Sequence, residues 1–185
     1  MESSYKRNLI NTVLAASESD SWESAVCEWE VYDCEEDNSL SSSCICGKEN
    51  LRYLYTIRNQ HSRKMLFPIG SCCIKKFGRK DLDEEISVTE GMFRLLHAIR
   101  DNDFIELSSR FFSRKLLKKL YDDGVFPPTK YNNQNGFTDY QFLLDMFNKR
   151  DKSTITVKQH KKIRGLIGYT IRPYLEKQFA DKIRN

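Results

Sequence analysis

Four of the six cysteines in this chain fall in two short clusters whose spacing could bind a metal ion. The first cluster is Cys44-Ile45-Cys46-Gly47, the second is Gly70-Ser71-Cys72-Cys73-Ile74, and His61 lies between them. Thiolates that converge from a glycine-containing turn and from the start of a helix suit a tetrahedral Zn²⁺ ion, which favours sulfur and imidazole ligands. We therefore predict one zinc-binding unit between the two clusters.

The spacing favours Cys44, Cys46 and Cys73 as three of the ligands. Two adjacent residues seldom point at the same ion, so Cys72 and Cys73 are expected to have different roles. The fourth ligand is either His61 or Cys72, and His61 is preferred because an imidazole can reach from a hairpin turn. No Asp or Glu stands beside this set as a general base, which favours a closed structural site over a catalytic one.

Alternating and helical patterns predict the elements that lead up to the first cluster. Residues 4–16 carry apolar side chains at helical spacing, whereas residues 25–32 alternate as a half-buried strand does. In that strand Cys27 is expected to be a small core residue. Cys34 falls in an acidic loop, and we assign it no role.

A hairpin and a short helix are predicted around the second cluster. Residues 51–58 and 64–69 alternate as two strands joined by a turn. Ser71 is placed to cap a short helix, and Gly78 is placed to end it. A cysteine-containing turn, a hairpin and a helix with cysteine in its first turn describe a treble-clef-like zinc unit. A helix N-terminus also lowers the pKa of a thiol, which helps it to serve as a thiolate ligand.

Beyond residue 87 the apolar period changes from two to about 3.6, as in helices. Thr138 and Thr156 each begin a capping box, Pro173 is expected to interrupt or restart a helix, and a terminal helix is expected from Tyr174 to Ile183. Apolar residues mark the helical segments at 92–99, 112–120, 138–147 and 156–171, with a short segment at 104–107.

These patterns predict an α+β fold. Residues 1–80 form an N-terminal helix and a zinc-stabilised β unit, residues 81–87 form an acidic linker, and residues 88–185 form a helical domain with basic faces. The 39% hydrophobic content is enough for a real core. With no secretory leader and no apolar run of about 20 residues, we expect a cytoplasmic protein of a bacterial host cell, and clustered cysteines in a reducing cytosol indicate metal rather than disulfides.

The net charge of +4 conceals strongly basic segments. Residues 48–80 hold nine basic and one acidic side chain, and residues 108–185 hold 17 basic and seven acidic ones. Basic side chains gathered on helix faces suit a phosphate-bearing partner, and Tyr53, Tyr55 and Phe67 could form a stacking platform in the hairpin or simply its core. The candidate partner-binding residues are Arg52, Arg58, Arg114, Lys115, Lys118, Lys119, Lys158, Lys161, Lys162 and Arg164.

Residues that would indicate catalysis are sparse. His97 is expected to be a packing or surface residue, and His160 lies among lysines where it could touch phosphate or face solvent. Asp122-Asp123, and Asp101 with Asp103, are paired carboxylates of the kind that hold Mg²⁺ in nucleases, but each pair falls near an expected helix end where Asp is common. A metal-dependent nuclease is therefore a minor alternative, and no small-molecule substrate is expected.

Several of these segments together resemble a group of small zinc-binding proteins encoded by bacteriophages and mobile elements of Gram-positive bacteria. The resemblance is carried by Glu28–Val31, Cys44–Lys48, Tyr53–Asn59 and Pro68–Phe77, and Phe142–Arg150 with Thr156–Gln159 is similar to phage accessory proteins. In that group a cysteine knuckle, a hairpin and a Gly-x-x-Cys helix recur. Related versions take a further ligand from a His near the hairpin turn, where this chain has Asn59 and, two residues later, His61.

The resemblance implies an accessory gene of a phage or plasmid, a context that includes nucleic-acid-associated factors and inhibitors of host defence such as anti-CRISPR proteins. Together with the basic faces, it predicts a non-enzymatic, zinc-stabilised protein that binds nucleic acid or a ribonucleoprotein. The alternative is an inhibitor that acts on a Cas9-type nuclease by protein contact. Naked nucleic acid separates the two, because only the first class binds it with a steep dependence on salt.

Overall fold

The chain has the α+β fold expected from its sequence, in a computed structural model that describes residues 3–101 and 105–184. It divides into two compact units. Unit 1 comprises residues 1–87 together with 181–185, and unit 2 comprises residues 88–180. Each unit buries its own set of large apolar side chains, such as Trp29 and Tyr55 in unit 1 and Phe93 and Leu95 in unit 2.

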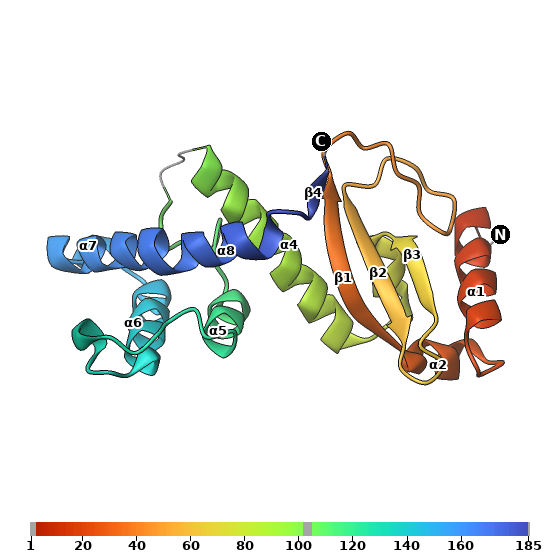
Figure 1. The fold of residues 1–185 in the computed structure, drawn as a ribbon, viewed down its shortest axis with the longest axis horizontal. Coiled ribbons are helices and arrows are strands. Elements are labelled where there is room, and N and C mark those ends of the chain that lie inside the picture. Colours follow the sequence, from red (N-terminus) through yellow and green to blue (C-terminus); the bar gives the residue numbers. More distant parts are fainter. Residues whose placement is uncertain (1–2, 102–104, 185) are drawn as a thin grey trace. The chain divides into compact units, whose positions relative to one another are not determined.

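Unit 1 is built on a mixed four-stranded sheet in the order β3-β2-β1-β4 (Figure 1). The strands are β1 (Trp29–Asp37), β2 (Tyr53–Asn59), β3 (Met65–Ile69) and β4 (Ile183–Arg184). β1, β2 and β3 pair antiparallel, whereas β4 pairs parallel to the end of β1, where Glu36 faces Ile183. The last residues of the chain therefore complete the sheet of the N-terminal unit.

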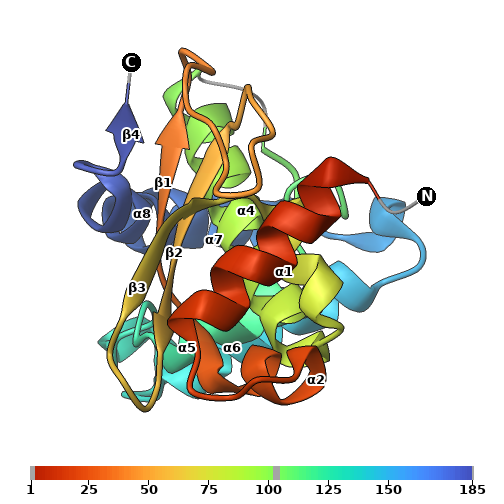
Figure 2. The ribbon, with the colours of Figure 1, turned by 90° about the vertical axis from the view of Figure 1, so that its right-hand side faces the viewer.

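One face of this sheet is buried under helices. On β2 the side chains of Tyr55, Ile57 and Asn59 are all fully buried. Helix α1 (Ser4–Ala16) lies on the same side of the sheet as the first turns of α4 (Lys80–Arg100), as Figure 2 shows. The short elements of this unit are α2 (Trp22–Ala25), η1 (Val26–Glu28), α3 (Ser71–Ile74) and η2 (Lys75–Phe77).

The predicted strand at residues 25–32 is correct only from Trp29 onward. The three residues before it are helical, because the Ser21 hydroxyl caps α2 by accepting from the Ser24 amide. The helical phase reverses the expected faces: Cys27 is exposed and Glu28 is buried, so the expectation that Cys27 is a core residue is wrong. Cys34, expected in a loop, is a buried residue of β1.

All regular secondary structure among the described residues of unit 2 is helical. Its elements are the end of α4, α5 (Arg114–Asp122), η3 (Lys130–Asn132), α6 (Gly136–Asn148), η4 (Lys152–Thr154), α7 (Val157–Leu166), η5 (Ile167–Ile171) and α8 (Arg172–Phe179). Figure 1 shows α7, η5 and α8 as one continuous helix, and η5 has π-type hydrogen bonding. Pro173 lies at the start of α8, so an α-helix restarts at the predicted place. Pro173 has no amide hydrogen to donate to the preceding turn, and the turn before it is the π-helical one.

Several helix boundaries differ from the prediction. Residues 81–87, expected as a linker, are part of α4. The first turn of this helix carries Asp81 and Asp83, whose negative charges interact favourably with the positive end of the helix dipole. Gly70 rather than Ser71 is the N-cap of α3, and Asn135 rather than Thr138 caps α6.

The expected terminal helix ends at Phe179, because Ile183 and Arg184 pair with β1. The Thr156–Gln159 capping box is confirmed. Residues 102–104, which include Asp103 and part of the expected segment at 104–107, lie outside the described residues. None of the described helices is both long and apolar enough to cross a membrane.

Candidate metal centre

The first cysteine cluster forms a tight turn that aims two side chains the same way. The Gly47 amide donates to the Cys44 carbonyl at 2.7 Å, and the Cys44 amide donates to the Lys48 carbonyl at 2.8 Å. Gly47 has φ of 92°, in the left-handed region that favours glycine. The turn is tied to the sheet, since the Ile45 amide donates to the Pro68 carbonyl of β3 at 2.9 Å.

The second cluster brings Cys73 to the turn from the opposite side. β3 ends at Ile69, and α3 begins two residues later with Cys73 on its inner face. Ile74 is fully buried and anchors this helix in the core. A Cβ added at Gly70 would lie 3.0 Å from a Leu51 methyl, so a larger residue here would require the Leu51 side chain to shift.

The three sulfur atoms converge on one point. Sγ of Cys73 lies 3.7 Å from Sγ of Cys44 and 3.5 Å from Sγ of Cys46, and all three lie within 4.8 Å of one another. A tetrahedral ion with metal–sulfur distances of about 2.3 Å separates its sulfur ligands by about 3.8 Å. The side chains are nearly inaccessible, with exposed fractions of 5%, 1% and 4% for Cys44, Cys46 and Cys73. This buried set could hold a metal ion.

Contacts within the group favour negative charge on one of its sulfur atoms. The contact between the Cys44 and Cys73 sulfur atoms lowers the pKa of Cys44 to about 5, despite the opposing effect of burial. The backbone amides of Cys46 and Gly70 also donate to this sulfur, the latter at 3.4 Å. The same contact raises the pKa of Cys73. A sulfur that already attracts donors from three directions is a good ligand for a cation.

The two candidates for a fourth ligand are not part of this cluster. His61 is exposed in the β2–β3 turn, where its amide donates to the Asn59 side chain at 2.9 Å. That turn precedes β3, whereas the sulfur atoms lie beyond the other end of the strand. Cys72 is exposed beside Cys73. Among the described residues, the cluster therefore offers three ligand atoms, all of them sulfur.

A buried carboxylate that the sequence reasoning missed holds the segment before the first cluster. The Asp37 carboxylate accepts from the amides of Ser39, Ser41 and Ser42 at 2.9–3.1 Å and from the Ser42 hydroxyl at 2.7 Å. Hydrogen bonds from the Ser39 and Ser42 side chains lower the pKa of Asp37 well below its usual range. An Asp followed at short range by several serines is the signal that could have identified this loop.

The carboxylate pair at the end of α5 is committed to other contacts. Asp122 pairs with Lys118, and Asp123 pairs with Lys119 at 2.5 Å and accepts from the Tyr174 hydroxyl at 2.6 Å. Both carboxylates are thus paired with a lysine of the same helix or its end, and Asp123 also accepts a hydrogen bond from a phenol. This arrangement gives the nuclease alternative no support.

The candidate partner-binding residues differ in how many contacts they make. Arg114 donates to Asn148 at 2.8 Å, Lys115 also has a partner, and Lys118 and Lys119 make the ion pairs given above. Lys162 pairs with the buried Asp139 at 2.7 Å. Those with neither an ion pair nor a side-chain hydrogen bond among the described residues are Lys158, Lys161 and Arg164 of α7, all exposed.

The hairpin residues proposed as a stacking platform do not share an exposed face. Tyr55 is fully buried and belongs to the core, whereas Phe67 is 41% exposed and has the Arg184 guanidinium over its ring at 5.6 Å. Arg52 pairs with Glu36 at 2.8 Å and Arg58 with Glu30 at 2.5 Å. The alternative interpretation, in which the hairpin aromatics form the core, holds for Tyr55.

Comparison with protein-family models, with curated proteins and with solved structures found no match for this chain.

Proposed function

We propose that this chain is a zinc-stabilised, non-enzymatic binding protein whose partner carries phosphate groups, as nucleic acid or a ribonucleoprotein does. The convergence of three buried sulfur atoms is the observation that carries the metal part of the proposal. Zinc suits an all-sulfur site because it accepts thiolate ligands readily and has no redox chemistry of its own in proteins.

A structural role fits the surroundings of the ion better than a catalytic role. The cysteines are almost completely buried, and among the described residues no carboxylate or imidazole joins their cluster to act as a base. The ion would link the turn at Cys44 to the start of α3 and so fix the end of the hairpin. Such sites contribute their binding energy directly to folding, about 10–16 kcal/mol of apparent binding free energy in zinc-finger peptides at neutral pH.

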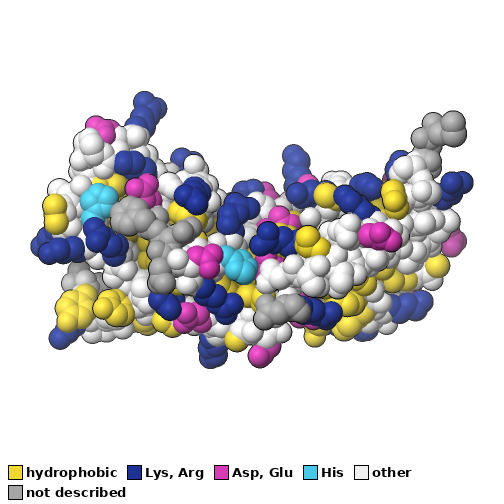
Figure 3. Space-filling model, turned by 90° about the horizontal axis from the view of Figure 1, so that it is seen from above, with side chains coloured by type: hydrophobic (Ala, Val, Ile, Leu, Met, Phe, Trp, Pro, Cys, Tyr) yellow, Lys and Arg dark blue, Asp and Glu magenta, His cyan; other side chains and the backbone are white. Residues whose placement is uncertain are grey.

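The basic residues of α7 support the phosphate-bearing partner. Ion pairs within a helix reduce the charge that a surface offers to a ligand, and the lysines of α5 near its end are paired in this way. Lys158, Lys161 and Arg164 make no such pair with a described residue. In the view from above, basic side chains lie around the left end of the molecule with acidic ones between some of them (Figure 3).

Metal analysis of matched cysteine variants tests the zinc site. Purified, tag-free protein is expected to hold one equivalent of zinc by elemental analysis, and Cys46→Ser should lose it because a buried ligand is removed. Cys27→Ser is the matched control, since Cys27 is exposed and lies outside the cluster. A metal-free wild type, or equal zinc in both variants, contradicts the proposal.

Salt dependence tests the partner. Binding of a labelled RNA or DNA oligonucleotide should weaken steeply as salt rises, because each phosphate contact releases counterions. The double variant Lys161→Gln/Arg164→Gln should bind more weakly and with a smaller salt slope than wild type. Absence of any binding to naked nucleic acid would exclude this partner. That result would favour the alternative function, an inhibitor of host defence that acts through protein contact.

A further inference from the structure

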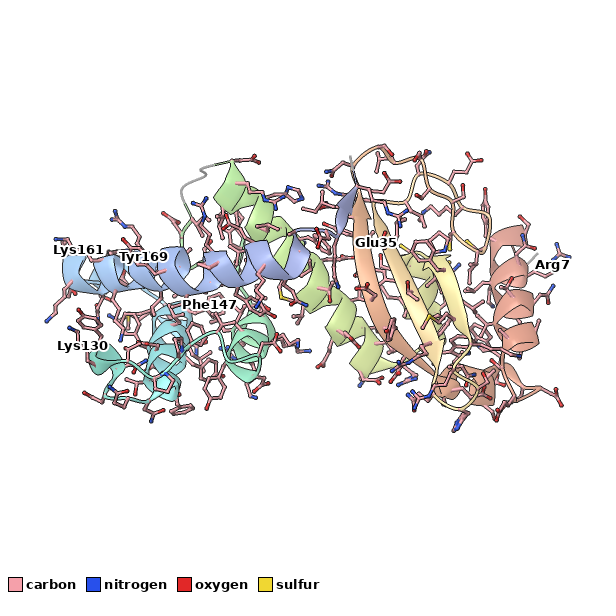
Figure 4. All side chains as sticks on the ribbon, viewed as in Figure 1. Arg7, Glu35, Lys130, Phe147, Lys161 and Tyr169 are labelled. Atoms are coloured by element: carbon pink, nitrogen blue, oxygen red, sulfur yellow. The ribbon has the colours of Figure 1, made fainter. Side chains whose placement is uncertain are left out.

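The long helix of unit 2 carries a second feature beside its basic residues. Residues 161, 164, 165, 168, 169 and 172 follow one another at intervals of three and one positions, which places them on one strip of the helix surface. They line a shallow depression that is open to solvent: Lys161, Arg164, Gly165, Gly168, Tyr169 and Arg172. Lys161 and Tyr169 can be followed along this helix in Figure 4.

Tyr169 is the residue of this strip that packing does not explain. Its side chain is 87% exposed, and its ring stacks on no other ring of the described residues. The neighbouring residues Ile167 and Ile171 are buried and pack this helix into the core of unit 2. The backbone of Tyr169 is therefore held in place while its ring faces solvent. An exposed aromatic ring carried by a packed helix offers a flat apolar surface to a ligand.

The two glycines beside the ring also have no internal explanation. A Cβ at Gly165 or Gly168 would meet nothing within 4 Å, and neither has the positive φ that requires glycine. Glycine is among the most costly residues inside a helix. Their effect is to leave bare backbone next to the tyrosine, so that a flat group can lie along the helix against the ring.

Basic residues flank Tyr169 and the two glycines at both ends of the strip. Lys161 and Arg164 lie on one side of Tyr169 and make no ion pair among the described residues. Arg172 lies on the other side, and its guanidinium forms an ion pair with Glu176 at 2.9 Å. From residue 161 to residue 172 the helix rises roughly 15 Å, a span over which a short stretch of a nucleic acid strand carries more than one phosphate.

We infer that this strip is a binding site for single-stranded nucleic acid, in which a base stacks on Tyr169 over the two glycines and the flanking phosphates contact Lys161, Arg164 and Arg172. The inference rests on the proposed function and adds the form of the nucleic acid. Bases stack on exposed aromatic side chains irrespective of sequence, while basic residues follow the backbone. In a duplex the bases already stack on one another, so the ring would have no partner.

The test compares a fluorescein-labelled 12-nucleotide DNA strand with the same strand annealed to its complement, using the full-length protein. Tyr169→Ala should weaken single-strand binding roughly 10-fold and Tyr169→Phe should preserve it, because stacking needs the ring and not the hydroxyl. Tyr131→Ala is the matched control: Tyr131 is 83% exposed and lies outside the strip. It should leave the affinity within about twofold of wild type, as neutral surface changes do.

Gly168→Leu provides a second test, in which a loss of binding cannot be attributed to a less stable protein. Leucine favours the helix and its Cβ would meet no atom within 4 Å at this position, so the melting temperature should stay or rise while single-strand binding falls. The inference is overturned if Tyr169→Ala and Gly168→Leu both bind the strand as wild type does, or if the duplex binds as tightly as the strand. Wild-type protein that binds neither this DNA nor an RNA oligonucleotide overturns the proposed function as well, which separates the two failures.

Discussion

Two buried acidic residues show how unit 1 uses charge inside its core. Glu28 accepts from the Glu18 and Ser19 amides at 2.9 and 2.8 Å, and from the Asn59 side chain at 2.6 Å. Asp37 accepts from the serine-rich loop in a similar way. In both cases a carboxylate replaces missing backbone partners of an irregular segment, so each loop is fixed without regular secondary structure.

Glu28 makes the stability of unit 1 sensitive to acid. Burial opposes its charged form, but the hydrogen bonds from Ser19, Glu18 and Asn59 outweigh that effect and lower its pKa from 4.5 to about 2. A folded-state pKa below the unfolded value stabilises the protein fully above the unfolded value. This contribution is lost as pH falls from about 4.5 toward 2.

We therefore expect Glu28→Gln to lower the free energy of unfolding by about 1–3 kcal/mol at pH 7, because charged hydrogen bonds are replaced by neutral ones. The deficit should shrink as pH falls through the window from about 4.5 to 2. Urea unfolding of variant and wild type at several pH values measures the difference, in which the titration of Asp37 cancels. A deficit that does not change with pH would show that the charge of Glu28 is not what stabilises the loop.

At the scale of the element, glycines show which helix positions are constrained from within. Gly136 begins α6 where an added Cβ would lie 1.9 Å from the Phe126 carbonyl oxygen, so backbone approaches backbone there. Gly165 and Gly168 in the continuous C-terminal helix meet nothing. The first position is constrained by packing inside unit 2, whereas packing within the described residues does not constrain the other two.

The contrast gives opposite expectations for the same substitution. Gly168→Ala should raise the free energy of unfolding by roughly 0.5–1 kcal/mol, because alanine is the better helix former and the space is open. Gly136→Ala should lower it by about 1–3 kcal/mol, since the backbone must move to admit the methyl group. Thermal or urea unfolding followed by circular dichroism measures both. Destabilisation by Gly168→Ala would mean that the helix has a packing constraint at this position.

At the scale of the whole molecule, two units with separate cores share one chain, and both tryptophans lie in unit 1. Trp29 is fully buried on β1, and Trp22 packs edge-on against Phe77 with ring centroids 5.4 Å apart. Phe77 lies close in sequence to Cys73 and ends the short helical segment that carries it. Tryptophan fluorescence therefore reports on the unit that contains the cysteine cluster.

Removal of zinc by a chelator is expected to lower the melting temperature seen by tryptophan fluorescence more than the one seen by far-ultraviolet circular dichroism, which also records the helices of unit 2. Binding to the folded state alone stabilises by about 2.7 kcal/mol when free zinc is 100 times its dissociation constant. Re-addition of zinc should restore the fluorescence transition. Identical curves with and without chelator would contradict a structural metal centre.

The sequence by itself determined the class of fold and the core of the candidate site. Cys44, Cys46 and Cys73 were chosen from spacing and expected helix position, and the structure brings their sulfur atoms together. The hairpin and α1 were also predicted, because apolar alternation and helical periodicity are local signals. The resemblance to phage and mobile-element proteins, and the partner that it implies, stay predictions.

Tertiary structure alone decided which other residues could join the site. His61 and Cys72 were reasonable fourth ligands by distance along the chain, but β3 separates the turn of His61 from the sulfur atoms and α3 turns Cys72 to solvent. Because the residues just before β1 are helical, Glu28 rather than Cys27 is buried in the core. Ile183 and Arg184 form β4 because the edge of β1 is free to pair with them. These outcomes depend on contacts between residues far apart in the sequence, and no local pattern of side chains encodes such contacts.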